Sequence, residues 1–521
     1  MSTQIPVVLL SHRGPVSFDR DAETGERTAT RGAGGLVTAL SGLAAHLDEA
    51  VWVFVAGGDE DVVVAREADG SPVRLLLDPE PRLIEDGEDE EGRQFPVRLL
   101  EIPHEVHEPF YGVISNPLLW FVQHRLYDLT RSPSLGREER TAFEEGYVVA
   151  NGLAADAVIE QVAKSGTRPV VLLHDYHFYL VGDLVRQSCP DALISHFVHI
   201  PWPEPDSWRV LPPDMRNRLL TGLLGCDIVA FHTRADARAF QLCCQELLGL
   251  PTDLRSMTVS VAGRTVRVRV YPISIDIPAL EAIAHTDASD EHLVDLDQTL
   301  GTGRLILRVD RTDPSKNIVR GFQAFDLLLA EHPEHHGNVV FLALLQPSRQ
   351  DVKEYADYLA AIGAAASTVN SHHGTGDWQP VDLRYASDMA LATAAYRRCD
   401  VLVVNAVADG MNLVAKEAVV LNERDMVLAL SEATGAHDEL GQFAVTLHPF
   451  DVAQQAEALH EALTMPPQLR RERREHAALI VHRNDVKRWL TVQLRDLAAL
   501  AGSDGSSWTD GAEGDHTDRP A

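Results

Sequence analysis

Two cations stand five positions apart in the chain, directly after an apolar run. Arg311 and Lys316 lie in the segment RTDPSKN, which follows LILRV at 305–309. Because Arg offers a planar fork of donors and Lys a compact charge, a loop that carries both can clamp a diphosphate. A surface ion-pair loop is the simpler alternative. The segment indicates a candidate anion site and, by itself, no more.

An acidic turn leads into a helical pattern further along the chain, in the segment ADGMNLVAKE at 408–417. Asp409 and Gly410 would stand at the mouth of the helix, where free N–H groups can bind phosphate or sugar hydroxyls. Glu417 lies about two turns further on, and a carboxylate accepts the two hydroxyls of a ribose well. A plain N-cap role for Asp409 is the alternative.

Histidines and a carboxylate follow two apolar runs in the first half of the chain, as HDYH at 174–177 and HIPWP at 199–203. The spacing lacks H-E-x-x-H or any closed ligand set, so we expect no metal here and favour hydrogen bonds to a sugar. Glycines at 32–35, downstream of SHRG at 11–14, would let backbone N–H groups approach a ligand, although a plain turn would look the same.

The sequence around these residues predicts parallel strands that alternate with helices, because short apolar β-branched runs alternate with helical patterns. In open α/β sheets ligands collect at the carboxyl ends of strands, which is where all these segments fall. The expected strands are 6–11, 51–56, 169–173, 195–200, 227–231, 266–273, 305–309, 339–345, 401–405 and 426–430.

The 521 residues are too many for one ordinary core. We expect two Rossmann-like doubly wound domains facing across a cleft. The expected divisions are 1–275 for an acceptor-binding domain, 276–475 for a nucleotide-sugar-binding domain, 476–501 for C-terminal helices packing back on the first domain, and 502–521 for a disordered tail.

Charge and cysteine content limit the class of protein. Lys and Arg number 46 against 77 Asp and Glu, a formal net charge of -31 that argues against nucleic acid and anionic membranes as partners. The acidic run at 85–91 reads as a solvated loop. The N-terminal apolar run is too short for a signal or membrane segment. We expect a cytoplasmic protein with five free thiols, Cys189, Cys226, Cys243, Cys244 and Cys399.

Together, and in this order, HDYH, HIPWP, RTDPSK and DGMNLVAKE resemble the trehalose-6-phosphate synthase family of retaining two-domain glycosyltransferases, over about residues 6–495. The resemblance implies the GT-B type of fold. It also implies transfer of glucose, with retention, from a nucleotide-glucose to glucose 6-phosphate, with no metal and no cofactor. These two substrates would be the partners, and the sequence leaves self-association open.

The resemblance also implies roles for individual residues. The phosphate of the acceptor would be held by Arg13, Tyr111, Trp120 and Arg349, and the acceptor sugar by Asp175. The donor would be held by Gly35, His199, Arg311, Lys316, Asp409, Gly410, Met411, Asn412, Leu413 and Glu417. The residues expected to act in catalysis are Asp175, His199, Arg311 and Lys316.

Three positions depart from the pattern of the family that the chain resembles. Val55 stands where the family often has a tryptophan, Asn317 replaces a common glycine, and Ala408 replaces an arginine. The run TDP-x-KN and the stretch NERD at 422–425 are shared with a branch that makes validoxylamine phosphate and, like some actinobacterial relatives, uses a GDP-linked donor. We therefore favour GDP-glucose over UDP-glucose. A pseudo-glycosyltransferase of that branch and a non-catalytic sugar-phosphate sensor are the alternatives.

Overall fold

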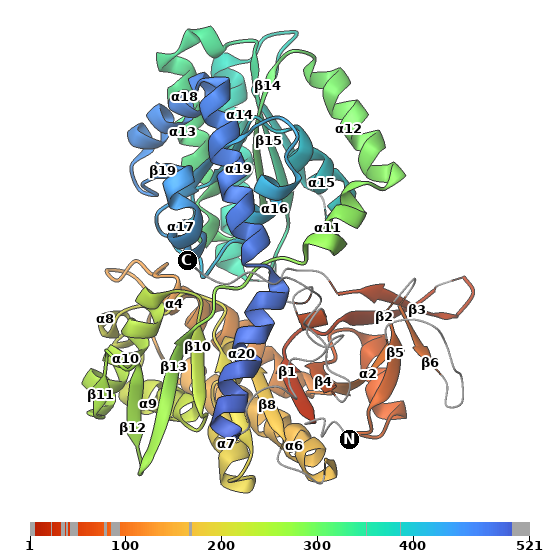
Figure 1. The fold of residues 1–521 in the computed structure, drawn as a ribbon, viewed down its shortest axis with the longest axis vertical. Helices are drawn as coiled ribbons and strands as arrows, with labels where there is room; N and C mark the ends of the chain where they lie inside the picture. The colour runs from red at the N-terminus through yellow and green to blue at the C-terminus, as the bar shows by residue number, and fades with distance from the viewer. Residues whose placement is uncertain are drawn as a thin grey trace, which may run out of the picture. The chain divides into compact units, whose positions relative to one another are not determined.

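The computed structural model describes residues 6–21, 23–32, 37, 40–41, 50–77, 81–84, 94–165, 169–350, 352–385 and 387–502 (Figure 1). Several predictions fall outside these residues. They are the glycine-rich loop with Gly35, most of the helix expected after it, the acidic run at 85–91 and the tail beyond residue 502. No helix in the described part of the chain is both long and apolar enough to cross a membrane.

The chain forms two compact units. The first takes in Met1–Ile273 together with Val486–Ala521, and the second is Ser274–Asp485. The last two helices are divided between them, since α19 (Pro467–Arg483) belongs to the second unit and α20 (Val486–Ala501) to the first. Residues 476–483, which the sequence analysis grouped with terminal helices on the first domain, are therefore part of the second unit.

The first unit is built on one large sheet in the order β11-β12-β13-β10-β9-β8-β1-β4-β7-β5-β6. Its middle is parallel, from β13 to β7, and an antiparallel hairpin closes each edge. The strands are β1 (Val7–Ser11), β4 (Ala50–Val55), β5 (Val73–Leu76), β6 (Arg82–Ile84), β7 (Gln94–Leu100), β8 (Val170–His174), β9 (Leu193–Phe197), β10 (Ile228–Phe231), β11 (Thr252–Asp253), β12 (Thr258–Val261) and β13 (Arg264–Val270). A separate hairpin joins β2 (Val16–Arg20) and β3 (Arg27–Arg31).

The central strands of this sheet are buried on both faces, which is why they read as unbroken apolar runs. The helices are α2 (Asp59–Glu67), α3 (His104–His107), the π-helix η1 (Glu108–Leu119), α4 (Trp120–Gln123), α5 (Arg137–Thr141), the π-helix η2 (Ala142–Val148), α6 (Val149–Lys164), the 3₁₀ turn η3 (Tyr176–Phe178), α7 (Val181–Ser188), α8 (Pro205–Trp208), α9 (Pro213–Leu224) and α10 (Arg234–Leu248).

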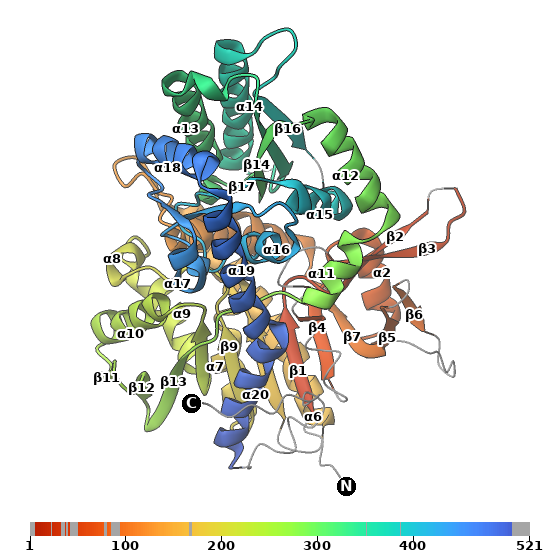
Figure 2. The same cartoon turned by 45° about the horizontal axis from the view of Figure 1, so that its top comes forward.

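Helix α20 belongs to the first unit, although in the chain it follows all the residues of the second unit. Figures 1 and 2 show it lying along the strands near β9. Trp489 and Leu497 are buried on its inner face. Its Asp496 accepts hydrogen bonds from Tyr271 Oη at 2.7 Å and from Arg269 Nε at 3.0 Å, both at the end of β13.

The second unit is a six-stranded parallel sheet in the order β16-β15-β14-β17-β18-β19. The strands are β14 (Arg304–Arg311), β15 (Val339–Gln346), β16 (Val381–Tyr385), β17 (Val401–Val404), β18 (Val427–Ser431) and β19 (Val445–Leu447). The helices are α11 (Ile277–Ala284), α12 (Asp287–Leu300), η4 (Pro314–Lys316), α13 (Ile318–Glu331), η5 (Pro333–His335), α14 (Lys353–His373), α15 (Met389–Arg398), α16 (Leu413–Leu421), α17 (Gly435–Leu440), η6 (Gly441–Phe443) and α18 (Val452–Thr464), with α19.

One core of this unit lies between the sheet and helices α13, α14 and α18, which Figures 1 and 2 both show together on one side. Phe322 and Phe325 of α13 meet Phe341 of β15 edge-on, with ring centroids 5.3 Å apart in each pair. Such arrangements add to the burial of apolar area. The core fixes α13 and α14 against the sheet.

Among the parallel strands, the order reverses once in each sheet. In the first unit the chain runs outward from β1 to β4 and β7 on one side and then to β8, β9 and β10 on the other. In the second unit β14 is followed outward by β15 and β16, and the chain then returns to β17. Crevices for ligands form where two adjacent strands send their connections to opposite faces. Those places are the carboxyl ends of β1 and β8, and of β14 and β17.

Candidate functional site

We call the two places where the strand order reverses the switch points. The first, at the carboxyl ends of β1 and β8, holds Asp175, directly after β8. Its φ of 72° is unusual for a residue with a side chain. Its N–H donates to Phe197 O at 2.8 Å, and its Oδ1 accepts the N–H of His199 at 3.4 Å. Backbone strain of this kind persists where the surrounding structure enforces it, and it is concentrated at functional sites. The two predicted residues Asp175 and His199 are thus brought together.

A buried pair of histidines stands beside this carboxylate. His174 Nδ1 and His199 Nε2 are 3.0 Å apart, so one of the two nitrogens donates to the other. Burial lowers the pKa of His174 to about 3. Burial, followed by the neighbouring histidines, lowers the pKa of His199 well below its ordinary value. Both rings are therefore neutral at pH 7, which suits hydrogen bonding to a sugar hydroxyl.

Aromatic rings continue this site from β1. The ring of His12 lies against the rings of both Tyr111 and His177, with centroid distances of 4.8 Å and 4.3 Å, and those two rings are 6.1 Å from each other. Tyr176 Oη donates to Asn116 Oδ1 at 2.8 Å, and Asn116 Nδ2 donates to Tyr111 O at 3.1 Å. Tyr111, on the π-helix η1, is thereby tied to the segment that carries Asp175.

Arg13 and Trp120 are two further residues predicted to bind the phosphate of the acceptor. Arg13 follows β1 and is exposed. Trp120 is buried and stacks on His124, with ring centroids 4.0 Å apart, and it also contacts Tyr176 at 5.6 Å. Four residues of this site, His12, His174, His177 and Asn116, have no separate role in the pattern expected from the sequence, although the runs SHRG and HDYH contain three of them.

The second switch point holds Lys316, at the end of η4, in an ion pair with Asp409. Burial by itself lowers the pKa of Lys316, but the carboxylates of Asp409 and Asp310 outweigh it and leave that pKa raised. Burial raises the pKa of Asp310 to about 6, against the opposing charges of Arg308 and Lys316. The lysine is thus a permanent cation at pH 7, in a place where water is scarce.

Arg311 ends β14 and is half-buried, five residues before Lys316. The bend between them is fixed by Asp313, which accepts the N–H of Ser315 at 2.9 Å. Asn317 then takes a left-handed φ of 60° and starts α13. Asparagine tolerates this conformation better than most residues, so it can replace the glycine of the family pattern.

Arg349 follows β15, and its guanidinium lies close to Asp313, in the loop between Arg311 and Lys316. It hydrogen-bonds Tyr355 Oη and lies 3.6 Å from Asp313 Oδ2. Tyr355 Oη in turn donates to Asp313 Oδ2 at 3.0 Å. The predicted acceptor-phosphate arginine is therefore coupled through one buried carboxylate to the predicted diphosphate loop.

The segment from Asp409 to Leu413 forms the turn into α16. Asn412 has a φ of 82°, and its side chain caps the helix by accepting the N–H of Ala415 at 3.1 Å. Asn412 Nδ2 also donates to Asp409 Oδ2 at 3.1 Å. Since Asn412 is the cap, the simpler N-cap role does not belong to Asp409.

Neighbouring backbone fixes the rest of this turn. The N–H of Gly435 donates to Asp409 O at 3.0 Å, and that of Ala436 donates to Met411 O at 2.7 Å. The backbone of Gly410 lies against Gly435, where a Cβ would collide with Gly410 O. The free N–H groups at the start of α16 are consequently held in one position.

Glu417 lies on α16, and Tyr396 Oη donates to its Oε2 at 3.1 Å. Burial raises the pKa of Glu417, and the hydrogen bond from Tyr396 opposes that rise. A half-buried carboxylate with one oxygen engaged by a tyrosine still has acceptor capacity for hydroxyl groups.

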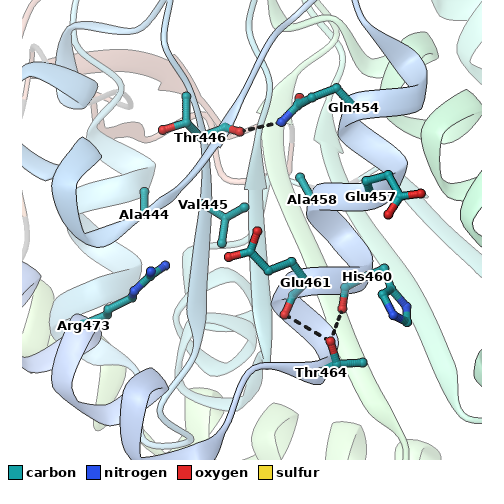
Figure 3. Close-up of a pocket in the computed structure, with 10 residues that line it drawn as sticks. All are labelled: Ala444, Val445, Thr446, Gln454, Glu457, Ala458, His460, Glu461, Thr464 and Arg473. Carbon is teal, nitrogen blue, oxygen red and sulfur yellow. Dashed lines mark hydrogen bonds between the residues drawn. The ribbon is translucent and has the colours of Figure 1, made fainter.

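A hollow of about 540 Å³ in the second unit lies away from all the predicted site residues (Figure 3). It is formed by β19, α18 and α19, and Arg473 and Glu461 stand on opposite sides of it. Among the described residues, the groups of side chains that could converge on a metal ion are on α13, α14, α18 and the turn η5, again outside the predicted site.

Comparison with known proteins decides the family. The profile of glycosyltransferase family 20 matches residues 6–499. The chain belongs to glycosyltransferase family 20. It is therefore a glycosyltransferase enzyme, and the expected fold of two Rossmann-like doubly wound units, the GT-B type, is confirmed.

Among relatives within family 20, an alpha,alpha-trehalose-phosphate synthase [UDP-forming] A of Dictyostelium discoideum is 31% identical over 93% of this chain and 61% of its own length. A validamine 7-phosphate valienyltransferase of Streptomyces hygroscopicus is also 31% identical, over 95% of this chain and 94% of its own. The solved structure of an alpha,alpha-trehalose-phosphate synthase (UDP-forming) from Burkholderia xenovorans in complex with glucose-6-phosphate is 26% identical, with a TM-score of 0.76 over 94% of this chain and 99% of that one.

Proposed function

We propose that this enzyme moves glucose from a nucleotide-glucose to glucose 6-phosphate, with retention, and forms trehalose 6-phosphate. The observation that supports the proposal best is the second switch point, where Lys316 stays protonated beside Asp409 and the capped start of α16. A cation there can neutralise a leaving diphosphate without a metal ion. The names of two of the relatives support the same donor and acceptor classes.

In the proposed reaction the bond between the anomeric carbon and the diphosphate oxygen breaks, and Arg311 and Lys316 stabilise the negative charge on the leaving group. A bond forms on the same face of the sugar to the acceptor hydroxyl oxygen, whose proton passes to a diphosphate oxygen. Asp175 would hold the acceptor sugar, and the neutral ring of His199 would hydrogen-bond the glucose. Glu417 would bind the ribose.

The nucleotide base of the donor, guanine or uracil, is a separate question. The run TDP-x-KN and the stretch NERD favour GDP-glucose, because a branch that shares them uses a GDP-linked donor. The synthases among the relatives above are UDP-forming and give that preference no support. We therefore propose a nucleoside diphosphate glucose as the donor class and leave the base to experiment.

A second candidate is transfer of a valienyl group to validamine 7-phosphate. It is supported by the Streptomyces relative, which is as similar to this chain as the synthase from Dictyostelium and matches it over nearly its whole length. Both candidates need an anion site for a phosphorylated acceptor and a nucleotide site, so they share the residues described above.

The deciding experiment measures release of nucleoside diphosphate with glucose 6-phosphate as acceptor, with GDP-glucose and UDP-glucose in parallel and no added metal. A phosphatase-sensitive trehalose product supports the proposal, and the faster donor identifies the base. Turnover only with validamine 7-phosphate and an activated valienyl donor would replace it with the second candidate. Binding of glucose 6-phosphate without any turnover would indicate a sensor.

A further inference from the structure

Two histidines at the end of α14 converge on one carboxylate of α13. His372 Nδ1 and His373 Nε2 each lie 3.0 Å from Asp326 Oδ1. Neighbouring residues on a helix point about 100° apart, so two adjacent side chains meet one atom only where that atom lies between them. The planes of the two rings are turned by 84° from each other, with their centroids 6.0 Å apart. Asp326 lies between the two rings.

The nitrogen–oxygen distances in this group fit a metal ion, and all three ligand atoms lie within 4.8 Å of one another. Ligand atoms about 2.0–2.1 Å from zinc, at tetrahedral or octahedral angles, lie roughly 3.0–3.4 Å from one another. Both nitrogens stand 3.0 Å from Asp326 Oδ1, and His372 Nδ1 is 3.4 Å from its Oδ2. Two imidazoles and one carboxylate are a donor set for zinc and its neighbours among the divalent transition metals, not for magnesium or calcium.

The surroundings favour a cation at this place. His372 and His373 are the last two residues of a helix of 21 residues, whose C-terminus carries a partial negative charge. His336 also faces His373, with ring centroids 5.4 Å apart, but its Nε2 is engaged by Leu329 O at 2.8 Å. His336 therefore packs against the ring of His373 and is not counted among the three ligands.

The two other groups of possible ligands among the described residues share His332, and both fit a metal less well. One has a single imidazole with the exposed carboxylates of Glu331 and Glu457, and the other combines His332 with Glu334 and His460. The rings of His332 and His460 stack face to face, with centroids 3.7 Å apart and planes within 14°. Ring nitrogens bind metals in the plane of the ring, so stacked rings cannot converge on one ion. His460 Nδ1 is also engaged by His335 Nε2 at 3.1 Å. Figure 3 shows His460 on the side of α18 away from Arg473.

We propose that Asp326, His372 and His373 bind one divalent transition-metal ion of the zinc class, with water completing the coordination. The site joins α13 to the end of α14, and these helices begin beside Lys316 and Arg349 of the candidate active site. None of the three ligands is among the residues assigned to the substrates. The ion would therefore act by holding the two helices together, not in the transfer reaction.

The test is equilibrium dialysis of the whole chain against Zn²⁺ under reducing conditions, with Co²⁺ absorption as a report on the ligand set. We expect one tightly bound ion per chain, and at least about a tenfold weaker affinity in Asp326→Asn and in His373→Gln.

The matched control is His332→Gln, which alters the stacked group alone and should leave the bound ion in place. Thermal unfolding in a chelator shows whether each variant folds like the unmodified chain. His372→Asn serves as the second ligand variant, since its side chain is more than half exposed and tolerates change. The proposal is overturned if the unmodified chain binds no Zn²⁺, if the ligand variants bind it equally well, or if His332→Gln removes it.

Discussion

Lys316 combines an ion pair with a position in the candidate site. Its ammonium group pairs with Asp409 where its side chain is only 14% exposed, and the charge of Asp310 also helps to raise its pKa. The surrounding carboxylates keep it charged, so the site holds a fixed cation before any substrate arrives. A preformed charge of this kind needs no reorganisation during reaction.

Lys316→Ala should therefore lower two quantities. We expect kcat to fall by about 100-fold or more, because stabilisation of the leaving diphosphate is lost. The free energy of unfolding should fall by about 1–3 kcal/mol, because the buried carboxylate of Asp409 loses a charged partner. Steady-state kinetics and denaturant unfolding measure the two effects.

The matched control is Lys353→Ala, which removes an exposed lysine paired with Asp357 on α14. Both side chains of that pair are well exposed, so neither kcat nor stability should change measurably. Equal losses in the two variants would show that the effect at Lys316 is nonspecific.

Glu417 gives a prediction that depends on pH. Burial raises its pKa above the ordinary value of 4.5, so the folded chain holds a proton there more tightly than the unfolded chain does. The charged form therefore costs stability at neutral pH, and this cost disappears as the pH falls to 4.5 and below. Glu417→Gln should raise the midpoint of thermal unfolding at pH 8 and have little effect near pH 4.5.

The same substitution should weaken donor binding at pH 8, since an amide is a poorer partner for two ribose hydroxyls than a carboxylate. Stability and donor affinity would thus change in opposite directions. A variant that is less stable than the unmodified chain at pH 8 would contradict the assignment of a raised pKa.

At the scale of elements, the two switch points depend on backbone that is fixed by close packing. The turn before α16 is held by hydrogen bonds from Gly435 and Ala436, at the start of α17. A side chain at residue 435 would collide with Gly410 O. The identity of residue 435 therefore controls the position of the backbone N–H groups at the start of α16, where we propose that the donor binds.

Gly435→Ala should displace this turn and lower stability by about 1–3 kcal/mol, the usual cost of overpacking a tight contact. KM for the donor should rise, because the displaced N–H groups no longer meet the ligand. Gly363→Ala is the control, within α14, where an added Cβ meets nothing closer than 4.0 Å. It should be neutral or stabilise the chain by up to about 1 kcal/mol.

At the scale of the whole molecule, the first unit is incomplete until the end of the chain has been made. Helix α20 buries Trp489, Leu490, Leu494 and Leu497, and Asp496 is bonded to Tyr271 and Arg269. Truncation after Asp485 should leave the chain insoluble or expose apolar surface that binds a hydrophobic dye. Loss of only 503–521, where Gly, Ser and Asp predominate, should leave the unfolding transition unchanged.

Asp496→Asn tests the same attachment with a smaller change. The amide keeps the size of the side chain but removes the charge that faces Arg269 and Tyr271. We expect a decrease of about 1–2 kcal/mol in the free energy of unfolding. An unchanged stability in this variant, together with a soluble protein truncated after Asp485, would show that α20 is dispensable to the first unit.

Much of this molecule could be predicted before the structure was known. The runs PVVLL and VLVVN are strands because parallel strands buried on both faces must be apolar throughout, and this pattern is visible in sequence. The strands β6 and β16 were missed because each lies at the edge of its sheet, and β16 also carries charged residues. The strands β5 and β7 were missed as well, although each is paired on both sides. The π-helices η1 and η2 also gave no distinct periodic signal.

The family, the two α/β units and the short runs that carry the candidate site could all be identified from the chain alone, because apolar periodicity and motif spacing are local properties. Which distant groups meet became clear only from the folded structure. Arg349 reaches Asp313, Tyr396 reaches Glu417, and α20 reaches β13 across 225 residues of chain between Tyr271 and Asp496. Such pairs depend on how sheets and helices pack, and no local pattern in the chain encodes the partner.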